Sequence, residues 1–252
     1  TMYSSKNPYN NIFNLTITYN HGSIDNPELP RASDLWSLLG TESRTFEELE
    51  LELQKIGAEM YLNVNNGSST LTISGFDENL DEILAICEDK IYNAKYDASK
   101  LAIMIDNDKM NKKTVKDSPD TWNSALYSYV LYGEKSSYLN KMDIEKWAKR
   151  DGDVILNEFK EIFNYGGDIS FNGNVDTKDV IAMLNLHNII KNDAVKAELK
   201  VNVPQEQNEN IVYFAHNKKF RQSNISIYVQ GEKLSKEEKA LSSVFNKYFG
   251  TD

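Results

Sequence analysis

The chain has 252 residues, of which 40% are hydrophobic and 26% are charged, and its formal net charge is −10 at pH 7. This composition is typical of a globular protein and argues against a disordered chain. The acidic balance argues against a nucleic-acid partner, because binding to phosphates requires an excess of Lys and Arg, and no apolar stretch is long enough to span a membrane.

The first forty residues predict one strand followed by one helix. Apolar and polar residues largely alternate over residues 12–20, which is typical of a half-buried strand. Asp25 and Glu28, three residues apart, resemble a capping pair at the start of a helix, and Gly40 marks the end of that helix.

A second helix and a hairpin follow. Thr45 and Glu48 have the spacing of a capping box, and we expect the helix that they begin to end at Gly57. Two strand-like runs, residues 58–64 and 69–74, are separated by a segment that contains an Asn-Gly pair. Such a pair between alternating runs is one of the strongest short-range signals for a β-hairpin.

Helical patterns dominate the middle of the chain. Residues 78–92 and 97–113 are predicted to be helices, and Ser118 followed by proline begins a further one. Cys87, the single cysteine, cannot form an internal disulfide and is expected to be a small core residue. The polar stretch 133–152 predicts a junction between two units.

Beyond the junction the sequence again mixes helices and strands. The expected helices are 154–163, 177–190 and one that Ser235 and Glu238 begin as a capping box, and the expected strands are 168–173, 197–203, 210–215 and 223–230. Strands in hairpins mixed with amphipathic helices predict an α+β fold, with helices packed on an antiparallel or mixed sheet. A dinucleotide-binding fold is not expected, because no G-x-G-x-x-G motif follows a strand.

Two stretches of the sequence repeat each other at an offset of 210 residues. The matched pairs include Asn14 with Asn224, Ile17 with Ile227, Gly40 with Gly250 and Thr41 with Thr251. An internal repeat of this kind indicates duplicated units. We therefore expect one unit over residues 1–148 and the N-terminal part of a second, homologous unit over residues 149–252. We also expect the chain to be a piece of a longer protein.

Residues of catalytic type lack the spacing that catalysis or metal binding would require. His21, His187 and His216 are far apart, and no acidic residue completes an H-E-x-x-H or H-x-x-E-H frame with them. We expect His21 and His216 in exposed turns and His187 on a helix, without a ligand role. No G-x-S-x-G motif is present, and burial would make the Cys87 thiol unreactive. The residues themselves therefore predict no catalytic, cofactor-binding or metal-binding site.

Carboxylates and aromatic residues are abundant, and a structural role explains most of them. The acidic residues at 47–52 and 77–82 fall between the apolar positions of helices, so we expect them on solvated surfaces. Four tyrosines gather near the predicted junction: Tyr127, Tyr129, Tyr132 and Tyr138. They could line a peptide groove, but packing of one unit on the next is the favoured interpretation. Three tryptophans are expected in the core: Trp36, Trp122 and Trp147.

Several segments, taken in order, resemble the opening of a pitrilysin-type (insulinase family) zinc peptidase domain. They are residues 13–19 (Phe-Asn-Leu-Thr-Ile-Thr-Tyr), 22–27, the Leu-Leu-Gly-Thr run at 38–41, the acidic pair 47–48, the helix end at 56–58, and residues 74–80 after the hairpin. The resemblance covers residues 12–145 as one family domain and 153–252 as the beginning of the next. It is strongest to bacterial secreted or envelope members.

The resemblance implies helices packed on one side of a sheet, and four such domains in a whole enzyme, arranged as two halves around a chamber. One half carries H-x-x-E-H and a more distant glutamate, and the other closes the chamber and holds the peptide. The helix that would carry H-x-x-E-H here reads Arg-Ala-Ser-Asp-Leu-Trp-Ser-Leu-Leu over residues 31–39, without a histidine. The helix of the distant glutamate reads Ile-Met-Ile-Asp-Asn-Asp-Lys over residues 103–109, without a glutamate. No zinc ligand can therefore be carried over.

The resemblance thus implies a non-catalytic, chamber-forming and peptide-contacting part of a zinc metallopeptidase. Zinc is expected in the catalytic half, supplied by the same longer chain or by a partner subunit, with peptides as substrates and the periplasm or cell envelope as the compartment. The family's non-catalytic half also contributes an arginine and a tyrosine that hold the substrate backbone, and the sequence ends at Asp252, before that segment. The alternative is a non-enzymatic interaction protein that retains the fold. An H-x-x-E-H motif upstream of Thr1 would favour the enzyme.

Overall fold

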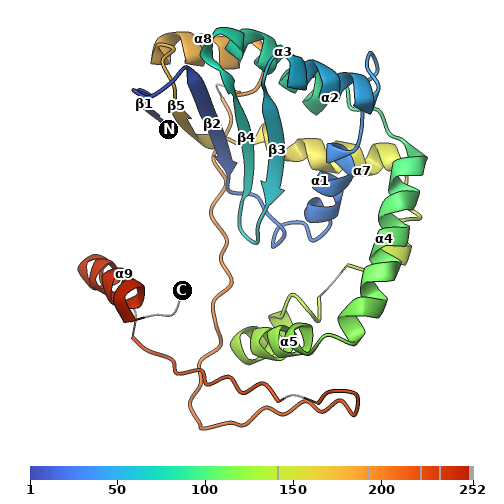
Figure 1. The fold of residues 1–252 in the computed structure, drawn as a ribbon, viewed down its shortest axis with the longest axis vertical. Coiled ribbons are helices and arrows are strands. Elements are labelled where there is room, and N and C mark those ends of the chain that lie inside the picture. The colour runs from blue at the N-terminus through green and yellow to red at the C-terminus, as the bar shows by residue number, and fades with distance from the viewer. Residues whose placement is uncertain (141, 192, 222, 233, 250–252) are drawn as a thin grey trace.

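The computed structural model describes residues 1–140, 142–191, 193–221, 223–232 and 234–249. Its centre is a five-stranded sheet with the strand order β1-β5-β2-β4-β3 (Figure 1). The strands are β1 (Met2–Ser5), β2 (Ile12–Tyr19), β3 (Glu59–Val64), β4 (Ser69–Phe76) and β5 (Gly167–Asn172). β1 runs parallel to β5 and the other neighbours are antiparallel, so the sheet is mixed. The predicted α+β fold is confirmed.

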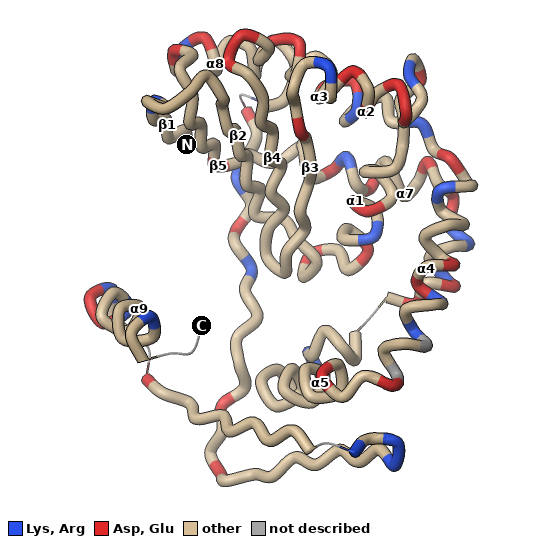
Figure 2. Tube along the Cα trace, viewed as in Figure 1, with Lys and Arg blue, Asp and Glu red and all other residues tan. Residues whose placement is uncertain are grey.

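Helices pack on one face of this sheet or lie beside it, and helices and loops carry most of the charge (Figure 1). They are α1 (Leu29–Ser37), α2 (Phe46–Lys55), α3 (Leu80–Tyr92), α4 (Ala98–Lys116), α5 (Pro119–Tyr132), α6 (Ile144–Trp147), α7 (Gly152–Lys160), α8 (Thr177–Leu186) and α9 (Lys236–Phe249). Charged residues lie mainly on helices and loops, whereas Glu59 and Asp168 are the charged residues of the strands (Figure 2). The predicted helices are present with shifted ends, and β1 and α6 were not predicted. No helix in the described part of the chain combines the length and the apolar character that crossing a membrane requires.

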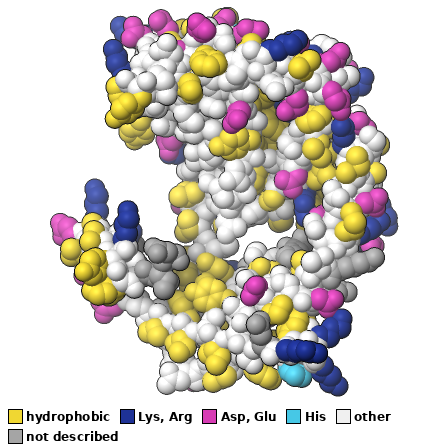
Figure 3. Space-filling model, in the orientation of Figure 1, with side chains coloured by type: hydrophobic (Ala, Val, Ile, Leu, Met, Phe, Trp, Pro, Cys, Tyr) yellow, Lys and Arg dark blue, Asp and Glu magenta, His cyan; other side chains and the backbone are white. Residues whose placement is uncertain are grey.

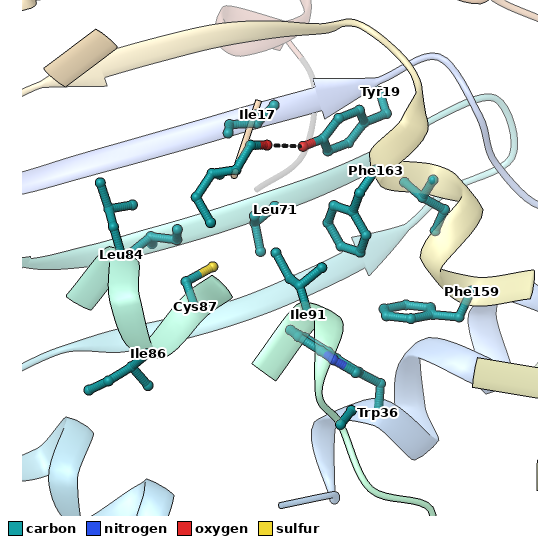
Figure 4. Close-up of a cluster of buried hydrophobic side chains, with 14 of the residues drawn as sticks. Ile17, Tyr19, Trp36, Leu71, Leu84, Ile86, Cys87, Ile91, Phe159 and Phe163 are labelled. Carbon is teal, nitrogen blue, oxygen red and sulfur yellow. Dashed lines mark hydrogen bonds between the residues drawn. The ribbon is translucent and has the colours of Figure 1, made fainter. Parts of the chain in front are cut away.

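The hydrophobic core lies between one face of the sheet and the helices. Alternate residues of β2 point into it, and all four are buried: Phe13, Leu15, Ile17 and Tyr19. Side chains of α3, among them Leu84, Cys87 and Ile91, lie in the same cluster (Figure 4). Each fully buried side chain of this kind stabilises the fold by about 1.5–3 kcal/mol. Cys87 is buried as predicted, and its burial raises the pKa of the thiol.

Three local predictions meet different outcomes. Thr45 and Glu48 form the expected capping box of α2, with the Glu48 amide 3.2 Å from the Thr45 hydroxyl. β3 and β4 form the expected hairpin, in which Val64 pairs with Ser69. The predicted capping pair at the start of α1 is wrong. Glu28 makes no side-chain cap, and Asp25 accepts a hydrogen bond from the Gly22 amide instead. A turn that precedes the helix thus uses the carboxylate locally.

Residues 152–190 belong to the same packed unit as the first ninety residues. β5 lies between β1 and β2 in the sheet. α7 packs on α1, where the ring of Phe159 is 5.3 Å from that of Trp36, and α8 packs on α3. The expected boundary between residues 148 and 149 therefore does not coincide with a break in the packing, because β5 completes the first sheet. A second homologous unit that begins further along the chain stays a prediction.

The chain after α8 first stays beside the sheet, where the Gly166 amide donates to the Val195 carbonyl and the Asn20 side-chain amide donates to the Ala197 carbonyl. It then continues as an extended segment (residues 198–221 and 223–232) past α5 to α9 (Figure 1). The predicted strands 197–203, 210–215 and 223–230 are wrong as paired strands, because no strand in the described ranges pairs with them. α9 forms as predicted, with a capping box between Ser235 and Glu238. Hydrophobic side chains lie on its surface (Figure 3), and the exposed ones are Leu241, Val244, Phe245, Tyr248 and Phe249.

α4 and α5 follow each other in the chain and lie to one side of the sheet, and α5 contacts the extended segment (Figure 1). Three aromatic pairs join them: Trp122 with Phe220, Tyr127 with Tyr228, and Tyr129 with Tyr213. Two of the four predicted tyrosines thus pack against the C-terminal part of the chain. Trp36 and Trp147 are buried as predicted, but Trp122 is 38% exposed, so its predicted core position is wrong.

Candidate functional site

The candidate site lies on α1, which the family resemblance matches to the helix that carries H-x-x-E-H in the family's catalytic half. Asp34 is its only acidic residue, and it has no histidine. An H-x-x-E-H frame with its acid at Asp34 would place the two histidines at positions 31 and 35, which Arg31 and Leu35 occupy. Pro30 lies in the first turn, where a missing amide hydrogen costs the helix nothing.

Three contacts fix the orientation of α1. The Ser33 hydroxyl donates to the Leu62 carbonyl of β3 at 2.9 Å. The indole nitrogen of Trp36 donates to the Lys90 carbonyl at 2.8 Å. The buried ammonium of Lys90 lies 3.3 Å from the Ser37 carbonyl at the C-terminal end of α1, where a positive charge is favourable. Burial lowers the pKa of Lys90. α1 is therefore held on a rigid support.

Arg31 binds one carboxylate on α4 and one on its own helix. Its guanidinium donates to Asp108 of α4 at 2.7 Å and to Asp34 at 3.2 Å. The side chains of Arg31, Asp34 and Asp108 are 38%, 58% and 14% exposed. Partial burial raises the pKa of Asp34 above its usual value, the guanidinium opposes this shift, and the charge of Asp108 adds to it. The arrangement is a positive charge between two negative ones.

This arrangement does not fit a zinc ion. An arginine side chain keeps its proton and has no lone pair to offer a metal, and its charge repels a cation. Leu35 is fully buried and has only hydrocarbon to present. No cluster of three or more His, Cys, Asp or Glu side chains able to hold a metal was found in the described ranges. We therefore derive no chemical step through a metal on this chain.

The three histidines occupy separate places. The ring of His21 stacks 4.8 Å from that of Tyr165 and is 14% exposed, so the prediction of an exposed turn is wrong for it. His187 follows α8 and bridges to α3, with Nε2 2.8 Å from Asp81 and Nδ1 3.4 Å from Glu88. His216 is exposed, as predicted. The structure brings none of them together.

The predicted surface carboxylates have structural roles or face solvent. Glu48 caps α2, and Glu52 pairs with Arg44, which also binds Asp89 at 2.6 Å. Glu47, Glu50, Glu78, Asp81 and Glu82 are exposed. The sequence did not indicate the Arg31–Asp108 contact or the Lys90 cap, because each joins residues that are far apart in the chain. The one local sign of the Arg31–Asp108 contact was that Arg31 stands at the first position of the missing H-x-x-E-H motif.

No protein-family model matches the sequence, and no curated protein matches it. Among solved structures, the chain is similar to the ferredoxin protease FusC, with a TM-score of 0.69 and 14% identity over 81% of this chain and 23% of that one. It is similar to a peptidase M16 inactive domain from Pseudomonas fluorescens, with a TM-score of 0.65 and 12% identity over 80% of this chain and 51% of that one. It is also similar to the periplasmic protease PqqL from Escherichia coli, with a TM-score of 0.65 and 15% identity over 81% and 23%.

The chain thus spans between about a quarter and about half of the length of the structures that it matches. At these identities the likeness concerns the fold. The mixed sheet with helices packed on it and the matched structures agree with the resemblance drawn from the sequence. The chain therefore has the pitrilysin-type (M16) peptidase fold, as a peptidase M16 inactive domain does.

Proposed function

We propose that this chain is a non-catalytic, chamber-forming and peptide-contacting part of a zinc metallopeptidase. The observation that supports the proposal is that α1 has Arg31 and Leu35 where an H-x-x-E-H frame with its acid at Asp34 would place the two histidines, within a fold similar to that of a peptidase M16 inactive domain. Hydrolysis by zinc-activated water would then belong to a catalytic half, in the same longer chain or in a partner subunit.

The open face of the sheet supports a role in lining a chamber. Its side chains are mainly hydroxyls and amides: Thr16 pairs in register with Thr72 and Ser170, and the hydroxyls of Thr18 and Thr70 are 3.2 Å apart. An antiparallel sheet can leave one face solvated when that face is polar. Hydroxyl and amide groups both donate and accept hydrogen bonds, so they suit contacts with peptide backbones of varied sequence.

The matched structures support the class of ligand and the compartment. One of them is a ferredoxin protease in complex with ferredoxin, and another is a periplasmic protease. We therefore propose that the present chain contacts a peptide or protein ligand and that it is located in the periplasm or cell envelope.

The absence of catalysis can be tested on the chain alone. We expect isothermal titration with zinc to give no tight one-to-one binding, and we expect no cleavage of unstructured peptides. Tight stoichiometric zinc binding together with peptide hydrolysis would contradict the proposal.

Peptide contact can be tested in the longer protein after a chelator has removed its zinc, so that the peptide is bound but not cleaved. Tyr61 lies on the open sheet face and is exposed, and Tyr9 is an exposed tyrosine in the loop before β2. We expect Tyr61→Ala to weaken binding of a labelled unstructured peptide several-fold, measured by fluorescence anisotropy, and Tyr9→Ala to leave it unchanged. Equal affinities for both variants and the unaltered protein would argue against contact through this face.

A non-enzymatic interaction protein is the alternative function. The longer protein and its co-purifying subunits distinguish the two. A domain with H-x-x-E-H in either would favour the peptidase, and its absence from both would favour the interaction protein.

A further inference from the structure

α1 and α4 meet at a place where two carboxylates need a positive charge between them. Asp34 of α1 and Asp108 of α4 both bind the Arg31 guanidinium. Among the described side chains, Arg31 is the only cation that the structure pairs with Asp108, and this carboxylate is largely buried. Without a counter-charge, two neighbouring carboxylates repel each other, and a largely buried one is costly to ionise.

We propose that the Arg31 guanidinium takes the place of a metal ion in this fold, as a cation of the chain's own that joins α1 to α4, and that the residue at position 31 decides whether the α1–α4 junction can bind a metal. This inference rests on the proposed function, because both identify α1 as the counterpart of the metal-carrying helix. It goes beyond that function in one respect: a charged group of the protein itself, the Arg31 guanidinium, occupies the α1–α4 junction.

The contact between Arg31 and Asp108 differs from an ordinary surface ion pair, whereas the pair of Arg31 with Asp34, on one helix and with side chains 38% and 58% exposed, is of that ordinary kind. Surface pairs typically join exposed side chains, often on one helix, and contribute little. Here the guanidinium reaches a largely buried carboxylate on a different helix at 2.7 Å, and holds a second carboxylate three residues along its own helix at 3.2 Å. The three groups come from the two segments that the family resemblance assigns to the metal motif and to the distant glutamate.

Arg31→His tests the proposal directly. It replaces the guanidinium by an imidazole that shares a helix face with Asp34 and lies across from Asp108, which gives three groups of zinc-binding type on two helices. We expect Arg31→His to bind zinc at least about tenfold more tightly than the unaltered chain, measured by competition with a chromophoric chelator, and to show a zinc-dependent rise in Tm. The added substitution Asp108→Asn should abolish both gains.

Arg31→Lys is the matched control, because it keeps a positive charge at this position and should gain no zinc affinity. If folded Arg31→His binds zinc no more tightly than Arg31→Lys, or if the unaltered chain binds as tightly as Arg31→His, the proposal is wrong.

A double-mutant cycle covers the case in which Arg31→His does not fold. Arg31→Ala, Asp108→Asn and the double variant should lower the Tm non-additively, because each single change removes the same contact. Additive shifts would contradict the proposal. The peptide-binding test of the Tyr61 face is independent of all these variants, so failure here and failure of the proposed function can be told apart.

Discussion

The two copies of the repeat have similar sequence patterns and different structures. In the first copy, Leu15 and Ile17 of β2 are 0% exposed, between β4 and β5 in the sheet. In the second copy, their counterparts Ile225 and Ile227 are 86% and 87% exposed, and residues 223–230 pair with no strand in the described ranges. An alternating pattern therefore provides a face to bury, but a strand forms only where neighbours complete its hydrogen bonds.

The helices of the repeat behave differently. α1 and its counterpart α9 both form, although α1 is packed on β3 and α7 whereas α9 leaves its apolar side exposed. A helix satisfies its backbone hydrogen bonds within its own segment, and a capping box such as that of Ser235 and Glu238 strengthens its first turn. The comparison thus separates what is encoded locally from what depends on distant partners.

The largest expected effect contrasts two matched isoleucines. Ile17→Ala should lower the free energy of unfolding by about 2–5 kcal/mol, because it leaves a cavity in a closely packed core. Ile227→Ala should change it by less than about 0.5 kcal/mol, because this side chain is exposed. Urea denaturation followed by circular dichroism measures both. Similar losses for the two variants would show that the second copy is packed as the first one is.

A smaller difference in unfolding free energy is expected between an ion pair of the packed unit and one of the extended segment. Arg150 pairs with Glu28 and with Glu158, which ties α7 to the start of α1. Arg150→Met should cost about 1 kcal/mol of unfolding free energy, since the groups are only partly shielded from solvent. Lys219 pairs with Asp117, and both side chains are more than half exposed. Lys219→Met should cost less than about 0.5 kcal/mol in the same denaturation experiment. A larger cost at Lys219 than at Arg150 would reverse the comparison.

The smallest effect concerns the contact between the extended segment and the first unit. Lys200 pairs with Asp25 at 2.6 Å. Burial alone would raise the pKa of Asp25, but hydrogen bonds from Lys200 and the Gly22 amide, with the nearby His21, outweigh it and hold the pKa below its usual value. A lowered pKa means that the contact contributes stability above the usual pKa and is lost as pH falls through the lowered one.

The pH effect can be followed at the Lys200 amide by NMR. We expect its signal to shift as the solution is acidified below the usual pKa of aspartate, and we expect Asp25→Asn to abolish this dependence. The same titration in both proteins would rule out Asp25 as the titrating group.

The parts of the fold that the sequence predicted are those with local signals. The α2 capping box, the β3–β4 hairpin and most helices follow from residues a few positions apart. The place of β5 could not be predicted in this way, because its pairing with β2 joins distant parts of the chain. The boundary expected between residues 148 and 149 rests on a local polar stretch, which carries no information on how β5 packs, and it stays a prediction.

The helix that carries the candidate site could be predicted from the sequence, but the contacts of its arginine could not. The family resemblance identified α1 and the absence of its histidines from the sequence of residues 31–39. The role of Arg31 emerged only when the fold brought Asp108 to it from α4. His21 was misjudged because its burial against Tyr165 depends on a segment far along the chain.

Hydrogen exchange of the two copies is the most direct test of the central comparison. Peptides that cover residues 12–19 and 223–230 can be followed in one experiment at neutral pH by mass spectrometry. We predict that the amides of β2 exchange slowly, near the limit set by global unfolding, and that those of residues 223–230 exchange close to the rate of an unstructured chain. Equal protection of the two segments would contradict the account, because it would require strand partners for the second copy.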